Sequence, residues 1–342
     1  MSFNNSFFKV LISTIALMLL SGFQEKTSIF THDLTPPPSP WVGREFDNGT
    51  DKFSFAIFTD LNGGERDGVF NVGAAQLALL RPELILSIGD LIDGGTEDKD
   101  QLKKEWDIFD KRAEATGAPI FRVGGNHDLT NVKMREVWEE RYGPRYYHFI
   151  YKDVLFLILD SEDFQEDRMQ EVYLERAKAI KVLDSPTPLE AYKMPYFKMI
   201  ERQTGEISPM QNAYFEKVLR DNPQVKWTFL FMHKPTWKRE DGKGMQTIEA
   251  ALNGRNYTVF NGHLHSFEYN KRLGMDYIML GTTGGSQRAG DPQAFDHLTF
   301  ITMDNKGPTI THLKMEGILD KTGHIPADGD LLCYQRTKCG EN

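Results

Sequence analysis

The chain is poor in cysteine and has no excess of positive charge, and both shortages limit the classes of function that it could have. Lysine and arginine together number 40 against 49 aspartates and glutamates, which gives a formal net charge of −9. Nucleic-acid backbones are bound by clustered positive charge, so this balance argues against such a partner. The cysteines, Cys333 and Cys339, lie near the C-terminus and belong to no metal or redox motif. They either form a bridge that closes a small terminal loop or remain two free thiols.

A long apolar run is also missing. The best candidate, residues 10–20, is too short to span a bilayer comfortably as a helix. Lys9 precedes it and the small residues Ser21 and Gly22 follow it, which predicts an export signal over residues 1–22. Phe23 stands where a lipoprotein would carry its lipidated cysteine, so we expect a periplasmic or secreted protein with no stable membrane insertion after signal cleavage. An uncleaved N-terminal anchor and a buried N-terminal helix are the alternatives.

What the sequence does contain is five short polar clusters, each at the end of an apolar run. The clusters are Asp60-Leu61-Asn62, Gly89-Asp90-Leu91-Ile92-Asp93, Gly124-Gly125-Asn126-His127-Asp128, Met232-His233 and Gly262-His263-Leu264-His265. They supply carboxylates, imidazoles and an amide oxygen in about the number that two metal ions need when both share one carboxylate. Loops use Gly, Asn and Asp for turns in any protein, but turns alone do not explain this ordered set.

The set resembles the motifs of the calcineurin-like metallophosphoesterases, also called the binuclear metallophosphatase superfamily. The family pattern runs D-x-H, G-D-x-x-D, G-N-H-[DE], H, G-H-x-H, and the chain matches it except that Asn62 replaces the first histidine. The resemblance covers roughly residues 53–316. It implies an α/β fold, a four-layer αββα sandwich of two mixed β-sheets flanked by helices. It also implies a hydrolase that cleaves phosphoric esters with a hydroxide bridging two metal ions.

The resemblance assigns ligands to both ions. The first ion is given Asp60, Asp90 and His265, and the second is given Asp90, Asn126, His233 and His263. His127 would lie beside them as the general acid for the leaving alkoxide, or as a donor to the phosphoryl oxygen. Mixed carboxylate and imidazole ligands suit Mn, Fe, Zn, Co or Ni better than Ca or Mg, so two divalent or trivalent ions of that group are the expected cofactors. If residues 262–265 are extended, strand alternation makes His263 and His265 point the same way.

Three further residues are predicted to assist the centre. Asp93 and Asp128 would orient histidines and backbone groups from outside the ligand set. Asn62 would be silent or would add a weak fourth ligand to the first ion. Its presence also raises the alternative of a non-catalytic protein that binds phosphoryl ligands through a degraded first metal site. His127 argues against that alternative, because a binding protein needs no general acid.

Five segments are expected along the chain: a signal peptide at 1–22, an extended leader at 23–52, the phosphoesterase domain at 53–316, a helical insertion within it at about 164–207, and a tail at 317–342. Apolar runs alternate with helical patterns, which predicts βαβ units whose strand ends gather the first three motifs. The insertion is highly charged and interrupted by prolines. It forms either a lid or cap over the site or a peripheral excursion.

The expected partner is a phosphorylated small molecule, because bound ions can reverse the local field of an acidic protein. Monoesters, diesters and anhydrides are all compatible with the motifs. Arg66 and Arg288 follow glycine-rich stretches and could clamp a phosphate by bidentate hydrogen bonds, or could be ordinary surface arginines. Trp237, Phe267 and Tyr269 could stack on a nucleobase, or could be core or rim residues.

Overall fold

The computed structural model describes residues 50–339. The predicted signal peptide at 1–22, and all of the leader at 23–52 except its last three residues, lie outside the described residues. Within the described part, no helix combines the length and the apolar character needed to cross a membrane.

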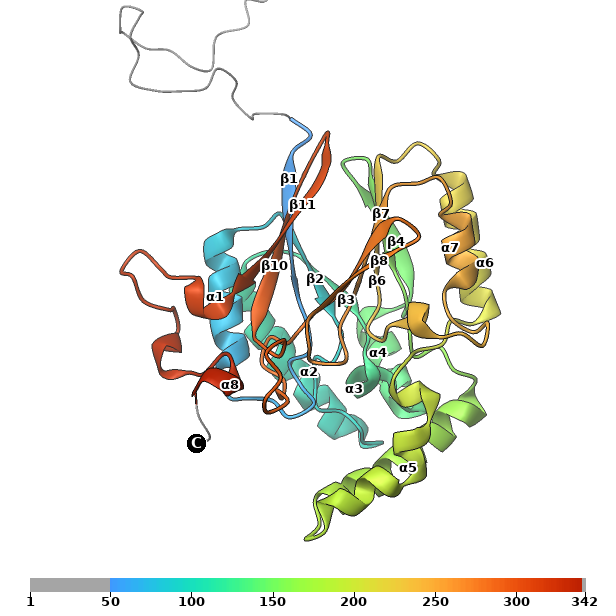
Figure 1. Cartoon of the computed structure of the whole chain (residues 1–342), viewed down its shortest axis with the longest axis vertical. Helices are drawn as coiled ribbons and strands as arrows, with labels where there is room; N and C mark the ends of the chain where they lie inside the picture. Colours follow the sequence, from blue (N-terminus) through green and yellow to red (C-terminus); the bar gives the residue numbers. More distant parts are fainter. Residues whose placement is uncertain (1–49, 340–342) are drawn as a thin grey trace, which may run out of the picture. The chain divides into compact units, whose positions relative to one another are not determined.

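Two mixed β-sheets face each other at the centre of the domain (Figure 1). The five-stranded sheet has the order β11-β10-β1-β2-β3, with β1 at Phe53–Phe58, β2 at Leu84–Ile88, β3 at Ile120–Val123, β10 at His297–Asp304 and β11 at Gly307–Lys314. The six-stranded sheet has the order β4-β5-β6-β7-β9-β8, with β4 at Tyr147–Tyr151, β5 at Val154–Ile158, β6 at Trp227–Phe231, β7 at Tyr257–Asn261, β8 at Glu268–Arg272 and β9 at Met275–Met279.

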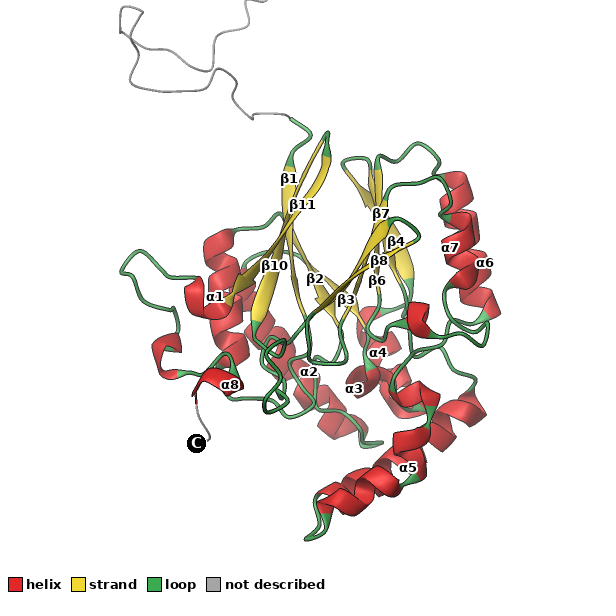
Figure 2. Ribbon diagram, in the orientation of Figure 1, coloured by secondary structure: helices red, strands yellow, loops and turns green. Residues whose placement is uncertain are grey.

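Helices cover the outer face of each sheet (Figure 2). The α-helices of the described residues, including those that do not pack on a sheet, are α1 at Val69–Leu80, α2 at Lys99–Ala113, α3 at Asn126–Leu129, α4 at Val132–Tyr142, α5 at Glu166–Leu183, α6 at Pro209–Asp221, α7 at Gln246–Ala251 and α8 at Arg336–Cys339. One apolar cluster joins α1, α2 and α4 to the five-stranded sheet, a second fills the space between the sheets, and a third joins α6 and α7 to the six-stranded sheet. These three cores separate four layers, which confirms the predicted αββα sandwich.

The pattern of the central strands explains this layering. All five residues of β2 are buried, and successive side chains point to opposite faces. Ile85 therefore enters the outer core with the helices, while Leu84 and Leu86 enter the core between the sheets. The strands β1, β2 and β3 run parallel, as do β5, β6 and β7. The carboxyl ends of each parallel set therefore open onto the same end of the sandwich.

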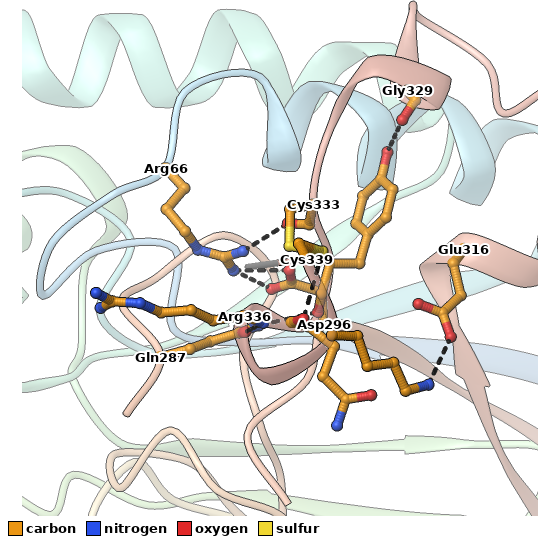
Figure 3. Close-up of a disulfide and its surroundings, with 11 residues drawn as sticks. Arg66, Gln287, Asp296, Glu316, Gly329, Cys333, Arg336 and Cys339 are labelled. Carbon is orange, nitrogen blue, oxygen red and sulfur yellow. Dashed lines mark hydrogen bonds and ion pairs between the residues drawn. A yellow bond between two sulfur atoms is a disulfide. The ribbon is translucent and has the colours of Figure 1, made fainter. Parts of the chain in front are cut away.

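Two segments add to the sandwich. Between β5 and α6, the insertion contains α5 and three short 3₁₀ helices at Pro188–Lys193, Pro195–Lys198 and Ile200–Arg202. We call residues 166–203 the cap. The tail folds back on the domain: Tyr334 is buried in the α1 core, and Cys333 and Cys339 form a disulfide (Figure 3).

Candidate metal centre

The predicted ligands occupy the loops that follow five strands. Asp60 follows β1, Asp90 follows β2, Asn126 begins α3 after β3, His233 follows β6, and His263 and His265 follow β7. Two groups of ligand atoms result, Asp90 with His233 and His263, and Asp60 with Asp90 and His265. Within each group the atoms lie within 4.8 Å of one another. The structure thus brings the predicted residues together, and Asp90 belongs to both groups.

Backbone carbonyls fix the tautomer of each histidine in these groups. His233 Nδ1 lies 2.8 Å from the Ile88 carbonyl, His263 Nε2 lies 2.7 Å from the Arg202 carbonyl, and His265 Nδ1 lies 2.6 Å from the Ser286 carbonyl. A carbonyl oxygen only accepts, so the ring nitrogen facing it must carry the proton. The opposite nitrogen then offers its lone pair to the centre, as a metal ligand requires.

Those lone pairs have no hydrogen-bond donor. Asn126 Oδ1, His233 Nε2 and His263 Nδ1 are buried without a hydrogen-bond partner in the described part of the chain. His233 Nε2 lies 3.1 Å from Asp90 Oδ2, and His265 Nε2 lies 3.3 Å from Asp60 Oδ1. A buried unsatisfied polar group costs about 1–3 kcal/mol, and facing lone pairs repel, so these positions call for cations. The donor set of carboxylate, imidazole and amide oxygen fits divalent transition metals.

The electrostatics of the pocket point the same way. Burial alone would lower the pKa of His233, but the neighbouring Asp90 carboxylate raises this pKa to about 10. The site therefore draws positive charge onto a nitrogen that the Ile88 carbonyl has already turned toward the carboxylate. Burial also pushes the pKa of His263 well below its ordinary value, which keeps that imidazole neutral and its lone pair available.

The backbone at the ligands is strained. Asp60, Asp90, His263 and His265 have φ values of 51°, 54°, 81° and 55°, in the left-handed region that non-glycine residues rarely adopt. Such strain persists where the surroundings enforce it, and it is concentrated at functional sites.

The prediction that His263 and His265 lie on one face of an extended segment was wrong. The strand ends at Asn261, and positive φ turns the two imidazoles into different groups.

Two aspartates predicted as outer partners contact the centre in different ways. The buried Asp128 carboxylate accepts the backbone N–H groups of Asp90, Leu91 and Gly125 at 2.8, 3.0 and 2.8 Å. It thereby ties the loop after β2 to the loop after β3, and burial raises its pKa to about 7. Asp93 acts through its backbone, because its carbonyl accepts from His127 Nδ1 at 2.7 Å.

His127 is held beside the ligands and meets a residue that sequence reasoning missed. With Nδ1 donating to Asp93, its Nε2 accepts from Arg176 Nη2 of the cap at 3.1 Å. Its backbone N–H donates to Asp90 Oδ1 at 2.8 Å. Burial lowers the pKa of His127, and the Arg176 guanidinium lowers it further. No motif marks Arg176; the charged insertion was its only signal.

The remaining predicted residues are Arg66, Arg288 and Asn62, and the structure places them differently. Arg66 lies outside the cavity described below: its guanidinium donates to both Asp296 oxygens at 2.6 and 2.7 Å and to the carbonyls of Gly285 and Cys333 (Figure 3). This network favours a structural role over phosphate binding. Arg288 lines the cavity. Asn62 is buried and its backbone N–H donates to the Asp90 carbonyl at 3.1 Å, so ligation by its side chain stays a prediction.

A cavity of 1020 Å³ opens over the centre. Its lining includes Asp90, Asn126 and His127 of the centre together with residues of the cap, Arg176 among them. The cap therefore lies at the site rather than at the periphery. Of the aromatic residues considered as stacking partners, Trp237 is buried in the outer core of the six-stranded sheet, and neither Phe267 nor Tyr269 lines the cavity.

Comparisons with known proteins agree with this geometry. The family model for calcineurin-like phosphoesterase matches residues 53–267. No curated protein matches the chain. A dimetal phosphatase from Danio rerio is 15% identical with a TM-score of 0.51, over 77% of this chain and 98% of its own. A purple acid phosphatase from yellow lupin seeds is 14% identical with a TM-score of 0.51, over 79% of this chain and 53% of its own. At these identities the likeness concerns the fold.

Proposed function

Because this chain belongs to the calcineurin-like phosphoesterase family and is a metal-dependent hydrolase of phosphoric esters, we propose that it is an exported enzyme acting on small phosphate mono- or diesters. The observation that supports the centre most strongly is that three buried atoms, Asn126 Oδ1, His233 Nε2 and His263 Nδ1, have no hydrogen-bond partner among residues 50–339. Of these residues, His233 and His263 form one ligand group with Asp90, the carboxylate common to both groups.

In this proposal Asp60, Asp90 and His265 hold one ion, and Asp90, Asn126, His233 and His263 hold the other. When bound, the ions would polarise the phosphoryl oxygens and lower the pKa of water at the site. The identity of the metals is proposed to fall among Mn, Fe, Zn, Co and Ni, since the ligands mix imidazole with carboxylate.

The protein's own contribution to turnover is proton transfer and positioning. His127 has its Nδ1 proton committed to the Asp93 carbonyl, so Nε2 is the atom that, after taking up a proton from water, passes it to the leaving oxygen. Arg176 donates to that same Nε2 in the resting arrangement. We propose that an incoming phosphoryl group attracts the guanidinium to its own oxygens, because an arginine pairs more strongly with an anion than with a neutral imidazole.

Export is proposed from the first 22 residues, with Lys9 before the apolar stretch and Ser21-Gly22 after it. The Cys333–Cys339 disulfide supports an oxidising destination, since such bonds persist outside the cytosol. Cell fractionation of the full chain, with N-terminal sequencing of the mature protein, tests this part. A protein retained in the cytosol with its first 22 residues intact would contradict it.

The catalytic proposal is tested by elemental analysis of the purified protein, together with hydrolysis of mono- and bis-(p-nitrophenyl) phosphate with Mn, Zn, Fe, Co and Ni added in turn. We expect about two ions per chain and metal-stimulated turnover. Asp90→Asn should remove both, whereas Asp221→Asn, which alters an exposed carboxylate of α6, should change neither. His127→Ala should slow esters with poor leaving groups by about 10²–10⁴-fold and spare activated ones.

The alternative of a non-catalytic binding protein rests on Asn62. It would take precedence if one ion or none bound and no ion gave turnover. The orientation of His127 favours the enzyme, because a binding protein has no use for an imidazole whose Nε2 is held beside the ligands and paired only with an arginine of the cap.

A further inference from the structure

The cap side of the cavity has a distinct composition. It includes three aromatic residues, Tyr192, Tyr196 and Phe197, within six positions of one another. Tyr192 and Phe197 lie with ring centroids 4.8 Å apart, and Tyr196 and Phe197 lie 5.6 Å apart in an edge contact. Aromatic pairs at these distances and tilts attract each other, so the three rings form one continuous apolar surface. We call it the aromatic wall.

Packing of the cap alone does not account for this wall. A ring that served only as cap core would be buried, yet Tyr192 is 57% exposed and Tyr196 and Phe197 are only partly covered. The Arg202 guanidinium lies 4.6 Å from the Phe197 centroid and covers one face of that ring. The two tyrosines therefore provide the open aromatic surface that faces the cavity.

The wall is anchored to the metal centre. The Arg202 carbonyl, at the end of the cap, accepts from His263 Nε2 at 2.7 Å. One residue earlier, the buried Glu201 has its carbonyl bound by Lys234 Nζ at 2.8 Å and its carboxylate bound by Arg168 Nη2 at 2.9 Å. These bonds tie the cap to a metal ligand and to the residue after His233, so the spacing between wall and centre is built into the fold.

The size and charge of the cavity indicate which kind of ligand it can hold. Its 1020 Å³ lies at the upper end of the range of about 300–1,000 Å³ in which proteins enclose drug-sized ligands. A phosphate on a short alkyl alcohol would leave most of that space to water. Arg176, Lys181, Arg202 and Arg288 line the cavity together with Asp90, Asp93 and Asp184, so four cationic side chains face three carboxylates.

From these observations we propose that the aromatic wall is a subsite for a planar ring in the alcohol part of the substrate, so that aryl or nucleoside phosphates are favoured over sugar or alkyl phosphates. The ring would stack on Tyr192 and Tyr196 while its phosphoryl group lies at the metal centre. Such stacking tolerates any flat ring, because every aromatic base has a π-face. The inference rests on the proposed function and deepens it by naming the substrate class.

The test compares two ligands that differ only by a ring. Adenosine 5′-phosphate and ribose 5-phosphate share the same phosphorylated primary alcohol, so a difference between them reports the base alone. Their inhibition constants are measured on the metal-loaded enzyme, with bis-(p-nitrophenyl) phosphate as the chromogenic substrate. We expect adenosine 5′-phosphate to bind at least about tenfold more tightly, as stacking on an aromatic side chain implies.

The variants locate the preference on the protein. Tyr192→Ala and Tyr196→Ala should each weaken the binding of adenosine 5′-phosphate and leave the binding of ribose 5-phosphate unchanged. The two changes together should make the two inhibition constants equal. Tyr269→Ala is the matched control, since Tyr269 is 53% exposed on β8 and does not line the cavity. Equal constants in the parent enzyme, or a preference that survives the double change, would overturn the inference.

Failure of the proposed function would look different. If no added ion gave turnover of the chromogenic ester, the catalytic assignment would be lost. The two ligands would then be compared by calorimetric titration of the metal-treated protein, where a ring preference removed by the two tyrosine changes still supports the subsite. Turnover without a ring preference would refute the subsite alone.

Discussion

Gly262 offers a direct test of how closely the centre is packed. A Cβ at this position would lie 2.2 Å from Asp60 Oδ2 and 2.5 Å from Thr59 Oγ1. Its φ lies outside the left-handed region, so alanine suffers no backbone penalty there and the whole effect of Gly262→Ala is steric. Ordinary contact begins at 3.4 Å, so Asp60 must withdraw by about 1.2 Å (3.4 − 2.2), a displacement expected to cost roughly 10²-fold in rate.

The withdrawal would also break the contacts that hold the carboxylate. Thr59 Oγ1 donates to Asp60 Oδ2 at 2.6 Å, and the His263 N–H donates to both Asp60 oxygens at 3.1 Å. We therefore expect Gly262→Ala to lower kcat/KM about 10²-fold and to weaken binding of one of the two ions, with a loss of stability of about 1–3 kcal/mol from overpacking.

The assay combines metal titration, steady-state turnover of bis-(p-nitrophenyl) phosphate and thermal unfolding. Gly317→Ala is the matched control, because a Cβ there meets nothing within 4 Å and its φ is not left-handed. Wild-type turnover and metal content in Gly262→Ala, with the domain folded, would refute the argument that Asp60 must stay where it is.

Two other predictions concern Asn62 and the buried His297. Asn62→His supplies the histidine of the family pattern, so it should tighten binding of the first ion by about tenfold if the new imidazole ligates it. Metal titration of both forms measures this affinity. Unchanged affinity would mean that the side chain at position 62 does not reach the ion. Burial lowers the pKa of His297 to about 3, against about 6.5 unfolded. The unfolded chain therefore binds a proton first as the pH falls, and His297 makes stability decline from about pH 6.5 toward 3 by up to about 1.4 kcal/mol per pH unit. Urea unfolding between pH 7 and 4 should show a shallower decline in His297→Phe, and identical slopes would contradict the assignment.

The strands that deliver the ligands could be predicted from the sequence because apolar runs stop where the motifs begin. The apolar runs that end at Asp60, Asp90 and Asn126 form the strands Phe53–Phe58, Leu84–Ile88 and Ile120–Val123. Burial on both faces makes such runs nearly continuous, so they stand out in any reading of the chain.

Elements with weaker patterns escaped prediction. Helix α4 buries Met134, Val137 and Trp138 between charged residues, and β8 is a polar edge strand whose residues are at most half-buried. Neither has an apolar run long enough to distinguish it from a loop. The left-handed backbone at His263 and His265 was equally invisible, because the residues that adopt it are not glycine.

Contacts between segments far apart in the chain could also not be predicted from the sequence. Arg176 meets His127 across 49 positions, and Arg66 meets Asp296 across 230. Local periodicity says nothing about such pairs, which depend on how the finished layers place their loops. For the same reason the motifs predicted a site, whereas the identity of the opposite wall of the cavity became apparent only from the fold.

The register of the central strand sets an order on the assembly of this protein. Phe53 of β1 pairs with Met303 of β10, so the strand that leads into Asp60 lacks one of its two neighbours until β10 has been made, about 250 residues later. Pairings of such long sequence separation form slowly, because loop closure must be completed before they contribute. Completion of the sheet that carries Asp60 therefore waits for β10. A polypeptide that stays open until its last strands arrive is also one that can be threaded through a translocation pore before it folds.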